Sequence, residues 1–560
     1  DGFFTGVVTA TSYAGDGSGL TGVAGTENIR TNTNATFLQN INVGVAITAG
    51  KLGIGFTDAN VKVGNNAADA LTTGTNNTAV GHNALTAATT ASDSVAIGED
   101  ALAGTTTGSN NIGIGVDALK ANTTGTGNIA VGRRALDANT DGNLNVAFGQ
   151  SALGANTTAD ANTAIGYAAL NVNTTGTKCV AVGAYALDAS DADDNTAVGY
   201  NAMTANTTGI RNAALGQSAL GANTTGTRNT AIGAQTLDAN TTASYNTAVG
   251  YAALTENTTG EYNTAVGQSA LLLNTTGQYN TAVGAYAMDA SSTSNYNTAV
   301  GYQALTANTS GDEHVAVGYE ALATNTTGTQ NTAVGFRALK TNNGSSNTAV
   351  GESALTANTT GNNNCAIGRD CLDANTTGTG NVALGVAALG ANTTANYNTA
   401  IGLDVLQNNT ADDNTGVGRN VLNANTTGTK NTAAGALALD ANTTADRNTA
   451  IGYQSLSANT TGERNTAVGT YSLISNSTGG DNVAFGDAAL YNNSTASYNT
   501  AVGRSAMSQN TTGASNTALG YNALNSNTTA SNNTAVGREA LNANTTGANN
   551  DAFGYVALAS

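Results

Sequence analysis

Large apolar residues alternate with small residues in a short segment that returns throughout the chain. In its first clear copy, Thr78-Ala79-Val80-Gly81, the first and third sites accept bulky apolar residues elsewhere, whereas the second and fourth sites stay small. Alternation with a period of two residues predicts a short β-strand. A second apolar pair, Ala84-Leu85, follows shortly after and predicts a second short strand.

The glycine that ends this segment recurs from Gly64 to Gly554. These 490 residues divide into twenty-six steps of 17 residues and three of 16, and the short steps end at Gly199, Gly351 and Gly418. A fixed short period indicates stacked repeats, and known helical repeats are about twice this length or more. The density of Gly, Asn and Thr also disfavours helix. The pattern therefore predicts an all-β fold, a parallel β-solenoid (β-roll) of about thirty 17-residue coils.

Alternation assigns one face of the first strand to the interior of the coil. We expect the bulky sites to point inward and the leucine of the second strand to complete a thin core. Two or three large apolar groups per coil bury too little surface, at about 25 cal/mol per Å², to outweigh ordering costs of about 1 to 2 kcal/mol per residue. Stacking and association of chains must supply the rest. The residues expected in the core are Val80, Leu85, Ile97, Leu102, Phe148, Val249 and Leu254.

The small sites are expected to lie where another backbone approaches closely. The expected neighbour is a second chain, in a side-by-side homotrimer that forms a rod. A single-chain solenoid, or coils joined end to end into a filament, would use the same repeat. The residues expected to pack between chains are Ala79, Gly81, Gly98, Gly132, Gly250 and Gly267.

Asparagine recurs at two sites of each coil, with Asn240 and Asn257 at one site and Asn246 and Asn263 at the other. Side-chain amides at such sites can form ladders along the stack. They can also satisfy turns through hydrogen bonds to the backbone. Sequons such as Asn240-Thr241-Thr242 follow from the repetition, and they would mark glycosylation only in a host that glycosylates secreted proteins.

Composition excludes several classes of partner. The 560 residues include 36 acidic and 18 basic side chains, for a formal net charge of −18. This charge disfavours nucleic acid and anionic membranes, because no basic cluster offsets it. No run of about 20 apolar residues occurs, so we expect no membrane insertion.

Few residues suggest chemistry. The two histidines, His82 and His314, lie far apart in sequence and cannot build a catalytic constellation. Acidic residues at 191–194 could hold calcium, but the nonapeptide of calcium-binding β-rolls is absent. A polysaccharide-cleaving enzyme would need clustered carboxylates, which the coils do not supply. We expect no catalytic residue, metal or cofactor. The chain has three cysteines, Cys179, Cys365 and Cys371, which are too few for a disulfide framework.

Tyrosine occupies one site of four consecutive coils, at Tyr245, Tyr262, Tyr279 and Tyr296. Their rings could lie in a row. Such a strip can bind a sugar or a partner protein by stacking, and neighbouring rings can equally stabilise the stack of coils. These four residues are the candidate ligand-binding residues, beside the structural alternative.

A five-residue phrase that ends in the recurring glycine is repeated across residues 64–560. Its copies include Ser94-Val95-Ala96-Ile97-Gly98, Asn145-Val146-Ala147-Phe148-Gly149 and many of the form Asn-Thr-Ala-Val-Gly. They resemble the head repeats of YadA-like trimeric autotransporter adhesins. The resemblance implies a left-handed parallel β-roll, three chains side by side, and a head that binds host matrix or cell surfaces. The repeats of that family are generally shorter.

The first 63 residues lack the regular 17-residue repeat. The glycine-rich segment 12–23 resembles phrases common in phage tail-fibre and virion-appendage proteins, and the alternation of Ile41, Val43 and Val45 predicts strands. The expected organisation is an attachment or assembly segment at 1–30, a β-rich connector at 31–63 and the solenoid at 64–560.

These observations favour a non-enzymatic structural surface fibre, either a phage tail fibre or an extracellular filament subunit, which projects or displays a binding end. The alternative is an adhesin head that binds a host-surface protein or glycan along its lateral face. The expected location is extracellular, on a cell or virion surface. The expected partners are copies of the chain itself, as a homotrimer or filament, and a host-surface glycan or protein.

Overall fold

A computed structural model describes residues 59–559 of the chain. By internal contacts the chain divides into two units, Asp1–Gly55 and Phe56–Ser560. The expected attachment segment at 1–30, and the expected connector as far as residue 58, lie outside the described residues. The end of that connector belongs to the solenoid, because Val61–Val63 is a strand that pairs with Thr78–Val80.

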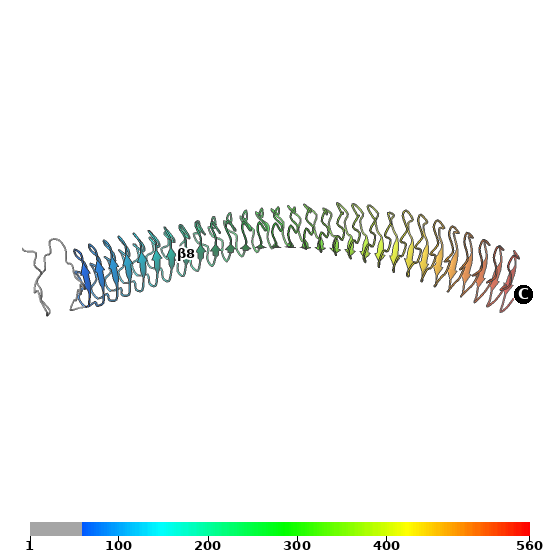
Figure 1. The fold of residues 1–560 in the computed structure, drawn as a ribbon, viewed down its shortest axis with the longest axis horizontal. Coiled ribbons are helices and arrows are strands. Elements are labelled where there is room, and N and C mark those ends of the chain that lie inside the picture. The colour runs from blue at the N-terminus through cyan, green and yellow to red at the C-terminus, as the bar shows by residue number, and fades with distance from the viewer. Residues whose placement is uncertain (1–58, 560) are drawn as a thin grey trace, which may run out of the picture. The chain divides into compact units, whose positions relative to one another are not determined.

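Residues 59–559 form thirty strands of three residues each and no helix, and the strands follow one another through the solenoid (Figure 1). Tight turns connect them. The strands are β1 (Val61–Val63), β2 (Thr78–Val80), β3 (Val95–Ile97), β4 (Ile112–Ile114), β5 (Ile129–Val131), β6 (Val146–Phe148), β7 (Thr163–Ile165), β8 (Val180–Val182), β9 (Thr196–Val198), β10 (Ala213–Leu215), β11 (Thr230–Ile232), β12 (Thr247–Val249), β13 (Thr264–Val266), β14 (Thr281–Val283), β15 (Thr298–Val300), β16 (Val315–Val317), β17 (Thr332–Val334), β18 (Thr348–Val350), β19 (Cys365–Ile367), β20 (Val382–Leu384), β21 (Thr399–Ile401), β22 (Thr415–Val417), β23 (Thr432–Ala434), β24 (Thr449–Ile451), β25 (Thr466–Val468), β26 (Val483–Phe485), β27 (Thr500–Val502), β28 (Thr517–Leu519), β29 (Thr534–Val536) and β30 (Asp551–Phe553).

Each strand pairs in parallel with the next strand along the chain, from β1–β2 to β29–β30. The register is constant, so Thr247 of β12 lies opposite Thr264 of β13. A step of 16 residues keeps this register, with Val180 opposite Thr196, because the missing residue is absorbed in a turn. The predicted parallel β-solenoid of 17-residue coils is confirmed.

The middle residue of each strand faces the interior of the coil, which reverses the expected faces. Ala79 has no exposed surface. The residues on either side of the middle site point outward, and Ile97 is 38% exposed and Phe148 55% exposed. The expectation that Val80, Ile97, Phe148 and Val249 line the core is therefore wrong. Alternation separated the two faces correctly, but it did not show which face is the inner one.

The interior is too narrow for a large residue at the middle site. Most coils place alanine there and a second alanine beside the core leucine. Where Val405 and Val421 replace that second alanine, Gly416 replaces the alanine of the strand. A Cβ atom at residue 416 would lie 2.6 Å from Cγ1 of Val405. Because close-packed interiors do not absorb added volume, the bulky strand residues must face outward.

The second apolar segment is a turn, where a second strand was expected. Leu85, Leu102 and Leu254 have no exposed surface and supply the large side chain of the core. Their φ angles of 56°, 54° and 53° lie in the left-handed region, which a strand does not use. The N–H of Leu85 still donates to the carbonyl oxygen of Ala101 in the next coil at 2.9 Å. Leucine burial and this bond offset the backbone strain.

The recurring glycine is required by contacts within the chain. Gly250 has φ of +133°, and a Cβ atom there would lie 2.5 Å from the carbonyl oxygen of Gly267. Consecutive coils of one chain therefore account for the small side chain. For Ala79, which has no exposed surface, the expected packing between chains is wrong. At the partly exposed glycines it stays a prediction, and these are Gly81, Gly98, Gly132, Gly250 and Gly267.

Two buried columns of asparagine run through the stack. In the first column, Oδ1 of Asn246 accepts the N–H of Asn263 at 2.9 Å, and its Nδ2 donates to the carbonyl oxygen of Gly260 at 2.8 Å. In the second column, Nδ2 of Asn257 donates to Oδ1 of Asn240 and to the same Gly260 oxygen, each at 3.0 Å. Both interpretations of the asparagines hold, since the side chains form ladders and also satisfy turns.

Candidate functional site

The third residues of the strands form a continuous row of apolar side chains along the solenoid, beside a row of first residues in which threonine predominates. The third residue of every strand from β1 to β30 is Val, Ile, Leu, Phe or Ala. Many of these side chains are more than a third exposed, and Phe485 reaches 56%. We call the first and third residues of the strands the outward stripe.

The outward stripe carries almost no charge. Its first residues in β1–β29 are Val, Ile, Thr, Ala or Cys, and Asp551 of β30 is its one charged member in the described strands. The whole chain has a net charge of −18, so charged side chains are confined largely to the turns. An uncharged apolar surface bordered by polar turns is typical of an interface that another protein covers.

The four candidate tyrosines do form a row, each placed two residues before a strand of β12–β15. Successive ring centroids lie 4.8, 5.0 and 5.2 Å apart, and adjacent ring planes are within 6° of parallel. The guanidinium carbon of Arg228, one coil earlier, lies 5.2 Å from the centroid of Tyr245. We call Tyr245, Tyr262, Tyr279 and Tyr296 the tyrosine ladder.

The tyrosine ladder presents ring edges rather than ring faces. Tyr262 and Tyr279 have a neighbouring ring against both faces, so a ligand cannot stack on either one. Parallel aromatic pairs of this kind stabilise neighbouring strands. The geometry favours the structural alternative, and it leaves edges and hydroxyl groups as the surface through which a ligand would have to bind.

The acidic residues at 191–194 serve the turns. Oδ1 of Asp191 accepts the N–H groups of Thr174 and Thr175 at 2.8 and 2.6 Å. Partial burial opposes its ionisation, yet the hydrogen bonds from Thr175 and Thr174 hold the pKa of Asp191 below its usual value. Oδ1 of Asp193 likewise accepts the N–H of Thr177 at 2.7 Å. In residues 59–559, no group of three or more His, Cys, Asp or Glu side chains is placed to hold a metal ion.

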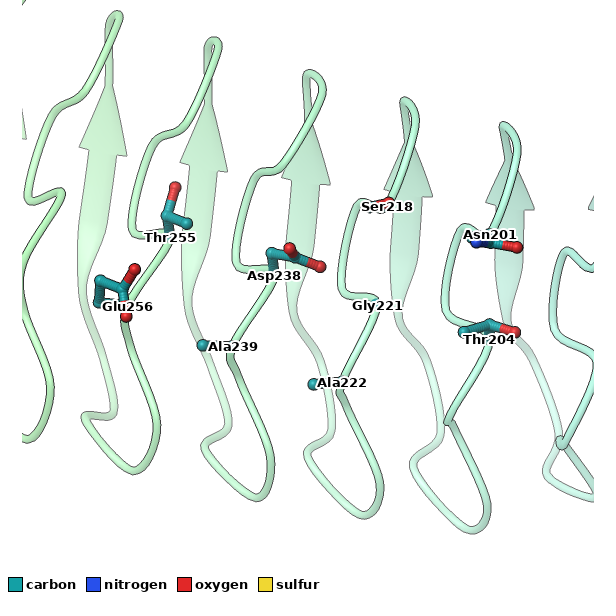
Figure 2. Close-up of a pocket in the computed structure, with 9 residues that line it drawn as sticks. All are labelled: Asn201, Thr204, Ser218, Gly221, Ala222, Asp238, Ala239, Thr255 and Glu256. Atoms are coloured by element: carbon teal, nitrogen blue, oxygen red, sulfur yellow. The ribbon is translucent and has the colours of Figure 1, made fainter.

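The structure brings together two carboxylates that sequence reasoning did not pair. Asp238 and Glu256, from neighbouring coils, line a hollow of about 410 Å³ (Figure 2). Burial raises the pKa of Asp238, and the charge of Glu256 raises it further. The sequence signal that could have predicted this pairing is their separation of 18 residues, which is one more than the repeat period.

The cause of this hollow is a missing side chain. Gly221 stands between Thr204 and Asp238 at the equivalent site of three consecutive coils, and it fills none of the space. Glycine at the same site produces similar hollows at Gly154 and Gly390, of which the first is lined by one carboxylate, Asp137, and the second by two, Asp370 and Asp373. Glycine at this site is common to the three hollows, whereas a carboxylate pair lines two of them.

His314 takes the place of an asparagine in the first column. Its N–H donates to Oδ1 of Asn297 at 2.9 Å, and its Nδ1 accepts the N–H of Asn331 at 3.2 Å. The side chain has no exposed surface, and burial lowers the pKa of His314 to about 4. The imidazole is thus neutral at physiological pH and acts as a structural hydrogen-bonding group.

The three cysteines are free and differ in accessibility. Burial raises the pKa of the Cys179 thiol to about 11 and that of the Cys371 thiol to about 12. Both are inert, because the thiolate is the reactive form. Cys365 is half-buried and occupies the first site of β19, so it belongs to the outward stripe.

The sequon asparagines of the repeated turns are part of the core. Asn240 has no exposed surface. Its Nδ2 donates to Oδ1 of Asn223 at 2.8 Å and to the carbonyl oxygen of Ala243 at 3.1 Å. Because Nδ2 is the atom that would carry the glycan, attachment there would break both bonds.

The described part of the chain contains no helix that could span a membrane. No protein-family model matches the chain, and no curated protein matches it. The resemblance to YadA-like head repeats therefore rests on the sequence phrases, and the outward stripe and the tyrosine ladder are the surfaces from which function can be argued.

Proposed function

We propose that this protein is a structural fibre subunit whose copies associate side by side along the outward stripe. The observation that carries the proposal is the stripe itself, whose third residue is apolar in every strand and which carries no charge from β1 to β29. Monomeric soluble proteins rarely expose continuous apolar patches larger than a few hundred Å². Covering such a surface stabilises an assembly by about 25 cal/mol per Å² of apolar area removed from water.

A copy of the same chain is the partner that matches the stripe over its whole length. The constant register repeats one outward pair, such as Thr247 and Val249, from coil to coil. A second solenoid offers the same spacing, about 4.8 Å per strand, so side chains of two copies can interdigitate along the stack. The assembly we propose is a homotrimer, which the resemblance to YadA-like repeats supports.

In this proposal the solenoid is a non-enzymatic spacer or display element on the outside of a cell or a virion. Stacked coils contact only their neighbours, so length increases by adding coils without changing any contact. The fibre would project a binding end, and it would need no cofactor.

An adhesin head is the second candidate, and the observation behind it is the exposure of the tyrosine ladder. Its side chains are 40–61% exposed, so their edges and hydroxyl groups are accessible. Replacing all four tyrosines by serine should abolish attachment to matrix-coated surfaces if the lateral face binds. Attachment that survives this replacement would exclude the ladder as the ligand site.

The first test of the fibre proposal is the absolute mass in solution, measured by light scattering after gel filtration. A homotrimer has three times the chain mass of 55.1 kDa. The variant V249K/V266K/V283K places three charges on the stripe and should shift the mass toward a single chain. The matched control T242K/T259K/T276K adds the same charges to exposed turn sites of the same coils and should remain assembled. A wild-type mass of one chain would overturn the proposal, two would indicate a dimer, and long polymers would indicate an end-to-end filament.

Cys365 offers a second readout on the stripe. In an assembled fibre its thiol should react slowly with a maleimide polymer, because neighbouring chains cover it. The stripe variant should expose it, whereas the turn variant should not. Rapid labelling of Cys365 in the wild-type protein would contradict a covered stripe.

A further inference from the structure

The tyrosine ladder holds four phenol rings in one fixed arrangement. The backbone N–H of each rung donates to a carbonyl oxygen of the preceding coil, as Tyr279 does to Glu261 at 3.1 Å. Parallel pairing of β12–β15 fixes the residues that follow. Rings are therefore kept at centroid separations of 4.8–5.2 Å without help from any other chain.

The ladder is also accessible to small molecules. The exposed fraction of its side chains rises from 40% at Tyr245 to 61% at Tyr296. A peroxide or a radical in solution can thus reach each phenol. Exposure combined with ring contact distinguishes these rungs from tyrosines that are exposed but alone.

We propose that the tyrosine ladder is a site of oxidative cross-linking, at which neighbouring rungs are joined as dityrosine. A one-electron oxidant, such as a peroxidase supplied with hydrogen peroxide, removes one electron and one proton from each of two phenols. The two phenoxyl radicals form a carbon–carbon bond between ring carbons ortho to the oxygen atoms, and each ring then transfers its ortho hydrogen as a proton to its own carbonyl oxygen, which restores the aromatic phenol. The sum is two tyrosines and one hydrogen peroxide giving one dityrosine and two waters.

Coupling needs neighbouring rings, because a radical must meet a second radical before it is reduced; the stacked pair Tyr302 and Tyr319, 5.5 Å apart, meets the same condition outside the ladder. At about 5 Å, an oxidised ring can exchange an electron with the ring beside it, so two oxidations anywhere in the ladder yield neighbouring radicals. Tyr397 and Tyr498 occupy the same site in other coils, but the residues one coil away from them are not aromatic. These two tyrosines carry the same phenol group without a neighbouring ring, so they serve as internal controls for the effect of ring contact.

A bond between rungs would tie each coil to the next. Residues 17 positions apart would be covalently joined, so a coil could no longer open alone. Local opening is the weak point of a stacked repeat, because each coil is held only by its neighbours. The cross-link would thus protect the solenoid in an oxidising environment. This inference does not depend on the proposed association of chains.

The test treats the full-length protein with peroxidase and a limited amount of hydrogen peroxide. We expect dityrosine fluorescence, and peptide mapping should show Tyr245–Tyr262, Tyr262–Tyr279 or Tyr279–Tyr296 pairs that have lost two hydrogen atoms. On a denaturing gel the product should run as a single chain. Cross-linking mainly at Tyr397 or Tyr498, or mainly between chains, would overturn the proposal.

Substitution by phenylalanine separates the chemistry from the folding. Y262F/Y279F keeps the stacked rings but removes the inner phenols, and Phe336 already stacks on Tyr319 at 5.3 Å in this chain. Its yield of bonds within the ladder should fall at least tenfold, whereas Y397F/Y498F should match the wild type. Unchanged ladder yield in Y262F/Y279F would refute the assignment, and light scattering of both variants reports the association of chains separately.

Discussion

Replacing Asn246 by alanine removes two hydrogen bonds that join one coil to the next. Oδ1 of Asn246 accepts the N–H of Asn263 at 2.9 Å, and Nδ2 donates to the carbonyl oxygen of Gly260 at 2.8 Å. Asn246 has no exposed surface, so water cannot replace the lost partners. Each buried group left without a partner costs about 1–3 kcal/mol. The N–H of Asn263 is the group left without a partner, because the Gly260 oxygen still accepts Nδ2 of Asn257 at 3.0 Å. We expect the variant to lose about 1–3 kcal/mol of local stability.

Hydrogen exchange followed by mass spectrometry measures this loss coil by coil. Because each coil contacts only its neighbours, faster exchange should be confined to peptides near residues 229–280. With a factor of ten for each 1.4 kcal/mol, exchange there should rise about fivefold or more. Coils near β3 and β28 serve as internal references.

Asn246→Ser is the matched control, since serine already occupies this column at Ser94. The Oγ atom of Ser94 accepts the N–H of Asn111 at 3.2 Å, so a serine keeps one of the two bonds to the next coil. The serine variant should fall between the wild type and the alanine variant. Unchanged exchange in the alanine variant, or an equal increase in every coil, would refute the reasoning.

Three further predictions test other parts of the coil. Gly250→Ala should lower the thermal unfolding temperature, because its Cβ atom would lie 2.5 Å from a carbonyl oxygen and its φ is +133°; a melting curve like that of the wild type would contradict this. The folded-state pKa of His314, about 4, lies below its ordinary value of 6.5, so its contribution to stability is present above pH 6.5 and is lost as pH falls toward 4. The lost stability is about 3 kcal/mol and should be visible at low pH as faster hydrogen exchange in that coil. The variant His314→Asn should not show this pH dependence. In denaturant-free buffer at pH 8, a small maleimide should label Cys365 faster than Cys179 or Cys371 in the stripe variant, and equal labelling of all three would show that the coils open.

The repeat by itself carried much of the fold. The 17-residue period predicted parallel stacked coils, and the substitutions around Thr78-Ala79-Val80-Gly81 separated two faces of a strand. The spacing of the tyrosines predicted a row of rings, and their stacking followed. The pairing of Asp238 with Glu256 was not anticipated, because it depends on how neighbouring turns close around Gly221.

The sequence determined the period, the register and the two-sided alternation, since these depend only on order along the chain. Tertiary structure decided which side faces inward, because alternation is symmetrical and a shift of one residue exchanges the faces. The interior of the coil is narrow and is filled mainly by alanine, leucine and asparagine. Where Val405 enters it, the neighbouring strand has Gly416 in place of alanine, because a Cβ atom there would clash with the valine. The valine and isoleucine residues of the strands are therefore displaced to the outside. The left-handed backbone of the core leucines, such as Leu254, could likewise not be predicted from local propensity. Burial in the closed coil offsets the strain of this backbone, and burial depends on the tertiary structure.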